Sequence, residues 1–231
     1  MLELINKYRK LFWKPKTMFY LGMITIIPFL ILAVASYFEW GLLGMFDDWI
    51  GREVHDERDS LLTILFTLIT RVGDGWFVAL FTLIVSIVIL FKFKNKWLSI
   101  WYFLTVALGA GGLNQILKFI FKRERPSDVE HLISQGGYSF PSGHAMGSMI
   151  VYGALIFLFI RLARKKITYV AATVGFGALV ALIGISRVYL GVHYPSDIIG
   201  GYSVGLMWIA FSIGMYGLSL TRRPEMDRLE E

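Results

Sequence analysis

Three short stretches of the chain contain the residue types from which a phosphoryl-transfer site is built. They are residues 118–126, 141–144 and 186–197. The first is rich in cations, the second has a hydroxyl and a histidine, and the third has an arginine, another histidine and a carboxylate. Phosphoryl transfer depends mainly on positioning and on stabilising charge at the phosphoryl oxygens. These side chains suit that chemistry if they meet at one site.

The second stretch, Pro141–Ser142–Gly143–His144, directly precedes a long apolar run. We expect Ser142 to cap the following helix and Gly143 to let a ligand approach the backbone closely. A helix start offers unpaired N–H groups and a positive dipole end, both of which favour phosphate. His144 then lies in the first turn, within reach of the bound group. Taken alone, the stretch also suits a plain loop-to-helix junction.

The third stretch places His193 four residues before Asp197, with Pro195 between them. The proline argues against one unbroken helix through both residues. We expect Asp197, near the start of the last apolar run, to accept the N–H of His193. Such a carboxylate fixes the tautomer of the ring and stabilises its charged form. Asp197 also suits a helix-start acid favoured by the helix dipole, and both roles can hold together.

The composition indicates an integral membrane protein. Of the 231 residues 56% are hydrophobic and 17% are charged, and the mean hydropathy is +0.61. A helix needs about 20 apolar residues to cross a bilayer. Continuous apolar runs without two-residue alternation favour helices over a barrel. The sequence thus predicts an all-α bundle, one domain over 1–231, with six membrane-spanning helices near 18–38, 76–91, 97–117, 143–162, 167–185 and 198–220.

The distribution of basic residues predicts the orientation. Most of the 23 lysines and arginines lie before the first span and after the second, fourth and sixth. By the positive-inside rule both termini are cytoplasmic. Within the first 17 residues, the spacing of apolar and basic side chains over 2–12 predicts an amphipathic helix on the lipid surface. Basic residues that flank spans are explained by acidic lipid headgroups, so nucleic acid is not an expected partner.

One basic cluster contradicts this distribution. Lys118, Lys122, Arg123 and Arg125 follow the third span, on the face predicted to lie outside. A lipid-facing flank is the structural explanation for such residues. The alternative is that the cluster faces an anion outside the membrane. The cations of the first and third stretches then belong to one site.

Other polar residues receive structural interpretations. Residues 39–75 have no assigned function, and the apolar run 61–69 is too short to span, so it suits an interfacial or re-entrant helix or the upper part of a bent second span. Asn114 and Gln115 suit either the pocket or helix packing. The acidic residues on the predicted outer face are interpreted as a solvated loop: Asp47, Asp48, Asp56 and Glu57. The two histidines that match no motif, His55 and His131, are interpreted as ordinary loop residues.

At this point the chain resembles the type 2 phosphatidic acid phosphatases, the PAP2 superfamily of membrane lipid phosphatases related to vanadium haloperoxidases. The motifs Lys-x6-Arg-Pro, Pro-Ser-Gly-His and Ser-Arg-x5-His-x3-Asp are all present without substitution. The resemblance implies that His193 is a nucleophile forming a phosphohistidine, that Asp197 orients it, and that His144 serves as acid and then base. It further implies a phosphate-binding set formed by Lys118, Arg125, Ser142, Gly143 and Arg187.

The resemblance also implies a substrate class. The chain looks most like the bacterial phosphatidylglycerophosphatase B type, which implies a multi-pass protein of the bacterial cell membrane with its site facing outside, acting on phosphatidylglycerophosphate. Undecaprenyl diphosphate or a broader range of lipid phosphates are the alternatives, and a haloperoxidase or a membrane transporter are the alternatives outside lipid phosphatases. No cofactor and no metal are expected, because fixed cations replace Mg²⁺. No obligate protein partner is inferred.

Overall fold

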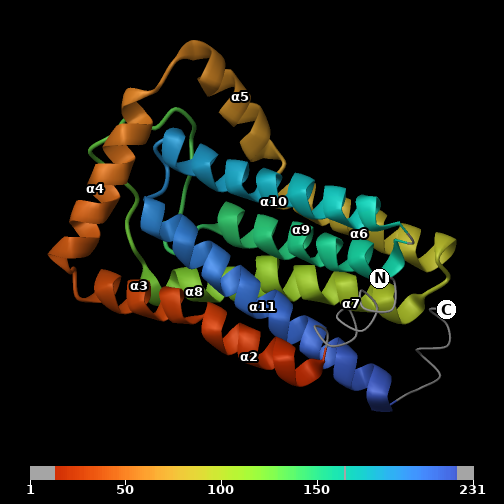
Figure 1. The fold of residues 1–231 in the computed structure, drawn as a ribbon. Helices are drawn as coiled ribbons and strands as arrows, with labels where there is room; N and C mark the ends of the chain where they lie inside the picture. Colours follow the sequence, from red (N-terminus) through yellow and green to blue (C-terminus); the bar gives the residue numbers. More distant parts are fainter. Residues whose placement is uncertain (1–13, 164, 223–231) are drawn as a thin grey trace.

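A computed structural model describes residues 14–163 and 165–222, and all regular structure within them is helical (Figure 1). The all-α prediction is confirmed. The amphipathic helix predicted over residues 2–12 lies outside the described residues. The helices are α2 (Pro15–Thr25), α3 (Ile27–Tyr37), α4 (Gly41–Asp56), α5 (Ser60–Arg71), α6 (Gly75–Lys92), α7 (Lys96–Val106), η1 (Ala107–Leu113), α8 (Asn114–Phe121), α9 (Gly143–Leu162), α10 (Lys166–Tyr189) and α11 (Pro195–Arg222).

Six helical segments of the described chain are long and apolar enough to cross a membrane, as the sequence predicted. They are Pro15–Tyr37, Gly75–Lys92, Lys96–Phe121, Gly143–Leu162, Lys166–Tyr189 and Pro195–Thr221. The first is divided into α2 and α3, because Pro28 near the start of α3 has no N–H for the helix ladder. The third contains the π-helical turn η1, where Gly109 packs against the Trp208 ring so closely that a Cβ would lie 2.4 Å from Nε1.

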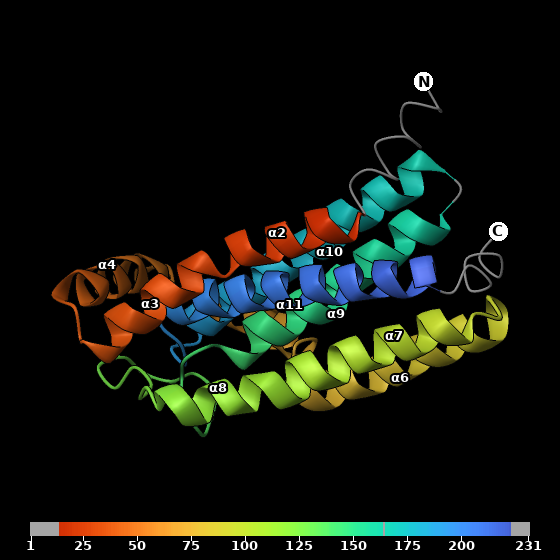
Figure 2. The same cartoon turned by 90° about the horizontal axis from the view of Figure 1, so that it is seen from below.

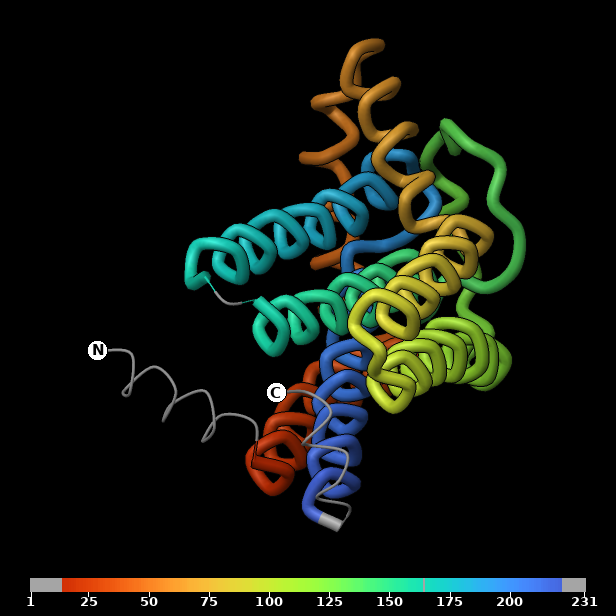
Figure 3. The backbone as a smooth tube through the Cα atoms, turned by 90° about the vertical axis from the view of Figure 1, so that its right-hand side faces the viewer, coloured from red at the N-terminus to blue at the C-terminus, as the bar shows by residue number. Residues whose placement is uncertain are grey.

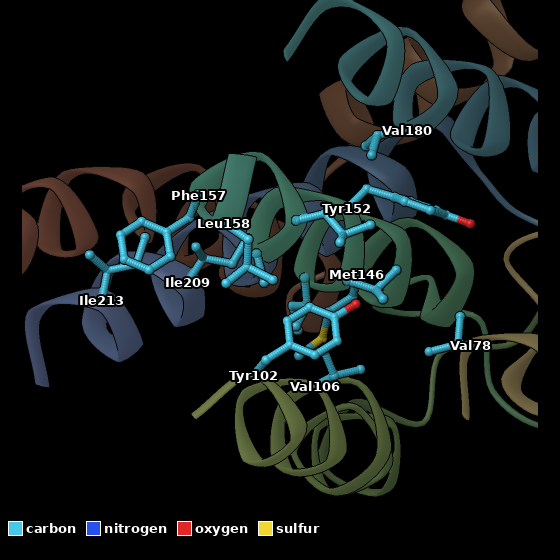
Figure 4. Packing of buried hydrophobic residues seen from close by; sticks show 14 of the residues in the cluster. Val78, Tyr102, Val106, Met146, Tyr152, Phe157, Leu158, Val180, Ile209 and Ile213 are labelled. Carbon is cyan, nitrogen blue, oxygen red and sulfur yellow. The ribbon is translucent and has the colours of Figure 1, made fainter. Parts of the chain in front are cut away.

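Helix α9 forms the centre of the bundle. More than half of the residues of α9 and α11 are buried, against under a third in the other spans. α9 packs against α6, α7, α10 and α11, and Figure 4 shows Met146, Tyr152 and Phe157 of α9 among apolar side chains of these neighbours. Because α9 is held on several sides, its first turn is a rigid place for functional groups.

Residues 39–75 form two helices outside the bundle. α4 lies across one end of it, and α5 returns from α4 along α10 to the start of α6 (Figure 1). Asp59 caps α5 by accepting from the N–H groups of Leu61 and Leu62, so the apolar run near 61–69 is a separate short helix. The predicted loop positions are corrected here: Asp47, Asp48, His55 and Asp56 belong to α4, and Glu57 ends it. Asp48 and Asp56 are exposed as predicted, whereas Asp47 is buried.

The three sequence stretches meet at the end of the bundle that α4 covers. The start of α2 and the end of α11 lie at the opposite end (Figures 1 and 2). The described chain therefore enters and leaves the bundle away from the candidate site, as the sequence predicted, because the number of spans is even. Which membrane face each end occupies stays a prediction from the positive-inside rule.

Candidate active site

The predicted site residues occupy helix ends and two connecting loops. Lys118 lies in the last turn of α8, and Lys122 ends that helix in a left-handed conformation with φ of 47°. The chain then turns into the loop 123–142. This loop folds back on itself, since Ser139 donates from its N–H to the Arg123 carbonyl at 2.8 Å and from its hydroxyl to the Glu124 carbonyl at 2.8 Å. The fold-back brings Lys118 and Arg125 to the same place.

His193 and Asp197 form the pair that the sequence predicted. Pro195 begins α11, and Asp197 in its first turn places Oδ2 3.2 Å from Nδ1 of His193. Both residues are buried. Because the carboxylate accepts the hydrogen bond from Nδ1–H, the lone pair of a neutral ring is on Nε2. Nε2 lies 3.1 Å from Nη1 of Arg125, so the atom predicted to be the nucleophile faces a cation.

Burial and positive charge keep this ring neutral. The pKa of His193 is lowered well below 6.5, first by burial and then by the charges of Arg125, Arg187 and Lys118. A protonated imidazole has no lone pair at Nε2 and cannot attack phosphorus. The surrounding cations therefore favour an anion and keep the His193 ring neutral, the form that its predicted nucleophilic role requires.

The start of α9 is arranged as the sequence predicted. The Ser142 hydroxyl accepts from the Ala145 N–H at 3.4 Å, and the Ser142 N–H donates to the Asp197 carbonyl at 3.0 Å. Gly143 faces Asn114 of α8, and a Cβ on Gly143 would lie 2.9 Å from Oδ1 of Asn114. Asn114 is buried and donates to the Met146 sulfur at 3.5 Å, whereas Gln115 is exposed. Asn114 thus serves packing between α8 and α9.

The three predicted cations reach the site from three elements. Lys118 donates from Nζ to the Tyr138 carbonyl at 2.8 Å, and Arg125 donates to the same carbonyl at 3.2 Å, so their charges lie side by side. Arg187 is 1% exposed, yet within the described residues its Nε has no hydrogen-bond partner. Its other nitrogens donate to Thr70 and Gln135, at 2.8 and 2.5 Å. A buried N–H without a partner is costly, so Arg187 is suited to an anionic ligand.

His144 has a partner that sequence reasoning did not find. Its Nε2 lies 2.9 Å from Oδ1 of Asp74, the residue that precedes α6. The hydrogen bond to His144 lowers the pKa of Asp74, so this carboxylate is charged at neutral pH. The absence of a side chain on Gly73 leaves room for this approach, because a Cβ there would lie 3.0 Å from the His144 ring. Asp74 has no motif around it, so sequence reasoning assigned it no role.

Arg123 and Asp47 extend the His193–Asp197 pair. Arg123 donates to Oδ1 of Asp197 at 2.8 Å and to Oδ2 of Asp47 at 2.7 Å. Asp47 also accepts from the N–H and the hydroxyl of Ser196, at 2.8 and 2.6 Å. The prediction of a solvated acidic loop is thus wrong for Asp47. Arg123, read in the sequence only as one of a basic cluster, links the covering helix α4 to the carboxylate behind the nucleophile.

Residues 99–219 match the family model described as the PAP2 superfamily. The chain belongs to this superfamily. All three motifs of the PAP2 chain fall inside the matched segment, whereas Asp47, Thr70 and Asp74 precede it. The positioning carboxylates of α4 and of the α5–α6 turn were therefore accessible only through the tertiary structure.

The relatives of this PAP2 protein include several lipid phosphatases. It is 33% identical over 187 residues to phosphatidylglycerophosphatase B of Bacillus subtilis, covering 78% of this chain and 86% of the relative. It is 32% identical over 104 residues to undecaprenyl-diphosphatase of Sulfolobus acidocaldarius, covering 43% and 46%. The crystal structure of a transmembrane PAP2 type phosphatidylglycerolphosphate phosphatase from Bacillus subtilis superposes with a TM-score of 0.79 at 29% identity, covering 88% of this chain and 99% of that chain. The six-span PAP2 fold is confirmed, and the protein is a membrane lipid phosphatase of this superfamily.

Proposed function

We propose that the protein removes the terminal phosphate of phosphatidylglycerophosphate, giving phosphatidylglycerol, through a phosphohistidine at His193 on the outer membrane face. The observation that carries the proposal is the Nε2 atom of His193, which is buried, oriented by Asp197 and 3.1 Å from the Arg125 guanidinium. A phosphoryl group bound by Arg125, Arg187 and Lys118 lies next to this nucleophile. Similarity to the phosphatidylglycerophosphatase over 86% of its length supports the choice of lipid.

In the first step the Nε2 lone pair of His193 attacks phosphorus in line. The N–P bond forms while the bond from phosphorus to the lipid oxygen breaks, and that oxygen takes a proton from His144. Because Nε2 of His144 is bonded to Asp74, the transferred proton is carried on Nδ1. The backbone N–H groups at Gly143 and the three cations stabilise the charge on the phosphoryl oxygens.

In the second step water replaces the lipid alcohol. Neutral His144 takes a proton from water, the hydroxide oxygen bonds to phosphorus, and the N–P bond breaks to release inorganic phosphate and neutral His193. The reaction consumes one water and leaves the lipid alcohol in the bilayer. No step needs a metal ion, since fixed cations supply the charge that Mg²⁺ supplies in kinases. Metal independence remains a prediction.

Undecaprenyl diphosphate is the second candidate substrate, supported by the similarity to an undecaprenyl-diphosphatase. The bond broken there joins two phosphates, and the product is a lipid monophosphate. The deciding experiment measures phosphate release by the purified protein from phosphatidylglycerophosphate, phosphatidic acid and undecaprenyl diphosphate in one detergent. At least tenfold higher kcat/KM for the first is expected. A preference of that size for the diphosphate would replace the proposed substrate.

A transporter is the alternative from another class. The charged site residues lie at one end of the bundle, whereas transport sites lie near the midplane. His193→Ala and His144→Ala separate the two functions. Both variants are expected to lose phosphate release while remaining folded in detergent. The wild-type protein is expected to carry an acid-labile, alkali-stable phosphate label, which should disappear in His193→Ala. Turnover like that of the wild type in either variant would reject the phosphohistidine mechanism.

A further inference from the structure

An apolar groove lies between α6 and α10, with α9 as its floor. Its volume is about 400 Å³, within the range of pockets that hold small ligands, roughly 300–1,000 Å³. Figure 3 looks along the bundle from the end opposite the catalytic residues and shows α9 between the two helices. The lining includes Phe81, Val85 and Val88 of α6, Leu158 of α9, and Thr168 and Phe176 of α10. None of these side chains belongs to the catalytic site.

The groove opens far from the catalytic residues. Its lining residue Phe93 follows Asp74 by 19 positions, and its lining residue Thr168 precedes Arg187 by 19 positions. At 1.5 Å per residue each interval is about 28 Å along a helix. The hydrocarbon of a bilayer is about 30 Å thick. The mouth of the groove therefore lies at the leaflet opposite the one that the catalytic site faces.

Cations surround this mouth on both sides. Lys92 and Lys94 flank Phe93 at the end of α6, and Lys165 and Lys166 begin α10 just before Thr168. All four are exposed, and none takes part in an ion pair with a carboxylate of the described residues. The first turn of α10 has no acidic residue and no side-chain cap, so its positive dipole end adds to the same field.

We propose that this groove is a binding site for an anionic phospholipid of that opposite leaflet, with an acyl chain in the groove and the phosphate against the four lysines. Lysines that only flank a span attract any acidic headgroup weakly and leave its chain among bulk lipid. Here an apolar cavity lies directly beneath them, so one lipid contacts both the charge and the groove. The site is separate from the proposed phosphatase activity. It fixes a lipid between α6 and α10, which both pack on α9.

The direct test uses photoreactive lipids and the full-length protein in phosphatidylcholine vesicles. One phosphatidylglycerol probe has its diazirine beside the headgroup and another has it at the chain end. A phosphatidylcholine probe of the same design is the reference. We expect the headgroup-proximal phosphatidylglycerol probe to label the chain around Phe93 and Thr168 at least fivefold more than the reference. Unlabelled phosphatidylglycerol should compete and phosphatidylcholine should not.

Two pairs of variants separate charge from cavity. Combined Lys→Gln changes at 92, 94, 165 and 166 should reduce labelling to the reference level, whereas Lys14→Gln with Lys16→Gln, at the start of α2, should not. Val88→Trp should lower labelling at least fivefold by filling the groove. Ile87→Trp is its control, because Ile87 also lies on α6 but does not line the groove. The exposed fraction is 45% for Ile87 and 43% for Val88.

Three results would overturn the inference. Equal labelling by the phosphatidylglycerol and phosphatidylcholine probes would show that charge does not select the lipid. Full labelling of the variant with all four Lys→Gln changes would show that these four lysines do not select the lipid. Labelling near Thr168 by the chain-end probe alone would show that the groove holds the far end of a lipid whose headgroup lies at the catalytic end. Phosphate release, measured in each variant, tests the proposed function independently.

Discussion

Arg123 donates a 2.8 Å hydrogen bond to Asp197, and this ion pair stands directly behind the histidine predicted to attack phosphorus. Asp197 is wholly buried, and a buried carboxylate is stable in its charged form only beside a cation or several donors. Asp47 of α4 holds the other side of the same guanidinium. The covering helix is therefore connected to the catalytic pair through one arginine.

Arg123→Gln is expected to lower kcat by roughly 10²-fold and to lower the free energy of unfolding by about 3–5 kcal/mol, because the Asp197 charge loses its partner. Asp47→Asn should lower kcat and the free energy of unfolding by smaller amounts, since Arg123 still forms its ion pair with Asp197. Phosphate release per folded molecule and thermal unfolding in detergent measure the two effects. Lys122→Gln is the matched control, being the exposed neighbouring cation. If Arg123→Gln matches this control in kcat, the positioning role is wrong.

Asp74→Asn tests the partner of His144. Asp74 keeps the imidazole oriented through a 2.9 Å contact, so its loss should lower kcat about 10–100-fold for a lipid substrate. The loss should be much smaller for p-nitrophenyl phosphate, whose leaving group departs without a proton. Asp56→Asn, at the exposed end of α4, is the control. Equal losses with both substrates would indicate a structural role instead of help to a general acid.

The pH profile reports the neutral state of His193. Its pKa is lowered well below 6.5, so the attacking form persists on the acid side of that value. Removing a cation makes protonation easier and raises the pKa of His193. In Arg125→Gln the acid limb of kcat/KM should therefore move to higher pH than in the wild type. The maximum value of kcat/KM should also be lower. Both proteins share one substrate in the assay, so ionisation of the substrate cancels. If the acid limb of kcat/KM stays at the same pH, Arg125 is not a cause of the lowered pKa of His193.

Gly143→Ala tests the close approach of α8 to α9. The added Cβ would lie 2.9 Å from Oδ1 of Asn114, closer than real contacts allow, so the Asn114 amide or the first turn of α9 must shift. We expect a loss of kcat with a small change in KM, because the N–H groups at the phosphate move. Asn114→Ala in the same chain opens the space and should restore part of the activity. Absence of any rescue would place the defect elsewhere.

Vanadate and EDTA test the chemistry of the anion site. Vanadate adopts the five-coordinate geometry of phosphorus in transfer, so micromolar to millimolar vanadate should inhibit competitively, and Arg187→Gln should weaken that inhibition. EDTA should leave phosphate release unchanged, because the proposed site uses Lys118, Arg125 and Arg187 in place of a metal. Strict dependence of turnover on an added divalent ion would contradict the mechanism.

Much of the site was predictable because several of its contacts join residues that are close together in the sequence. The Ser142 cap, the start of the last helix near Pro195 and the contact between His193 and Asp197 all depend on residues within four positions of one another. The six apolar spans were equally readable, since the thickness of the bilayer fixes how many apolar residues a helix needs. The sequence by itself thus determined the fold class, the motif residues and the end of the bundle at which they gather.

Only the tertiary structure decided which partners complete the site. Asp74 lies 70 positions from His144, and Asp47 lies 76 positions from Arg123, through which it reaches Asp197. Neither carries a local pattern. Asp47 was predicted to lie in a solvated acidic loop, and Asp74 received no interpretation. They become positioning groups because α4 folds over the end of the bundle and the α5–α6 turn meets the start of α9. Contacts at such separation are set by helix packing, which local spacing does not encode.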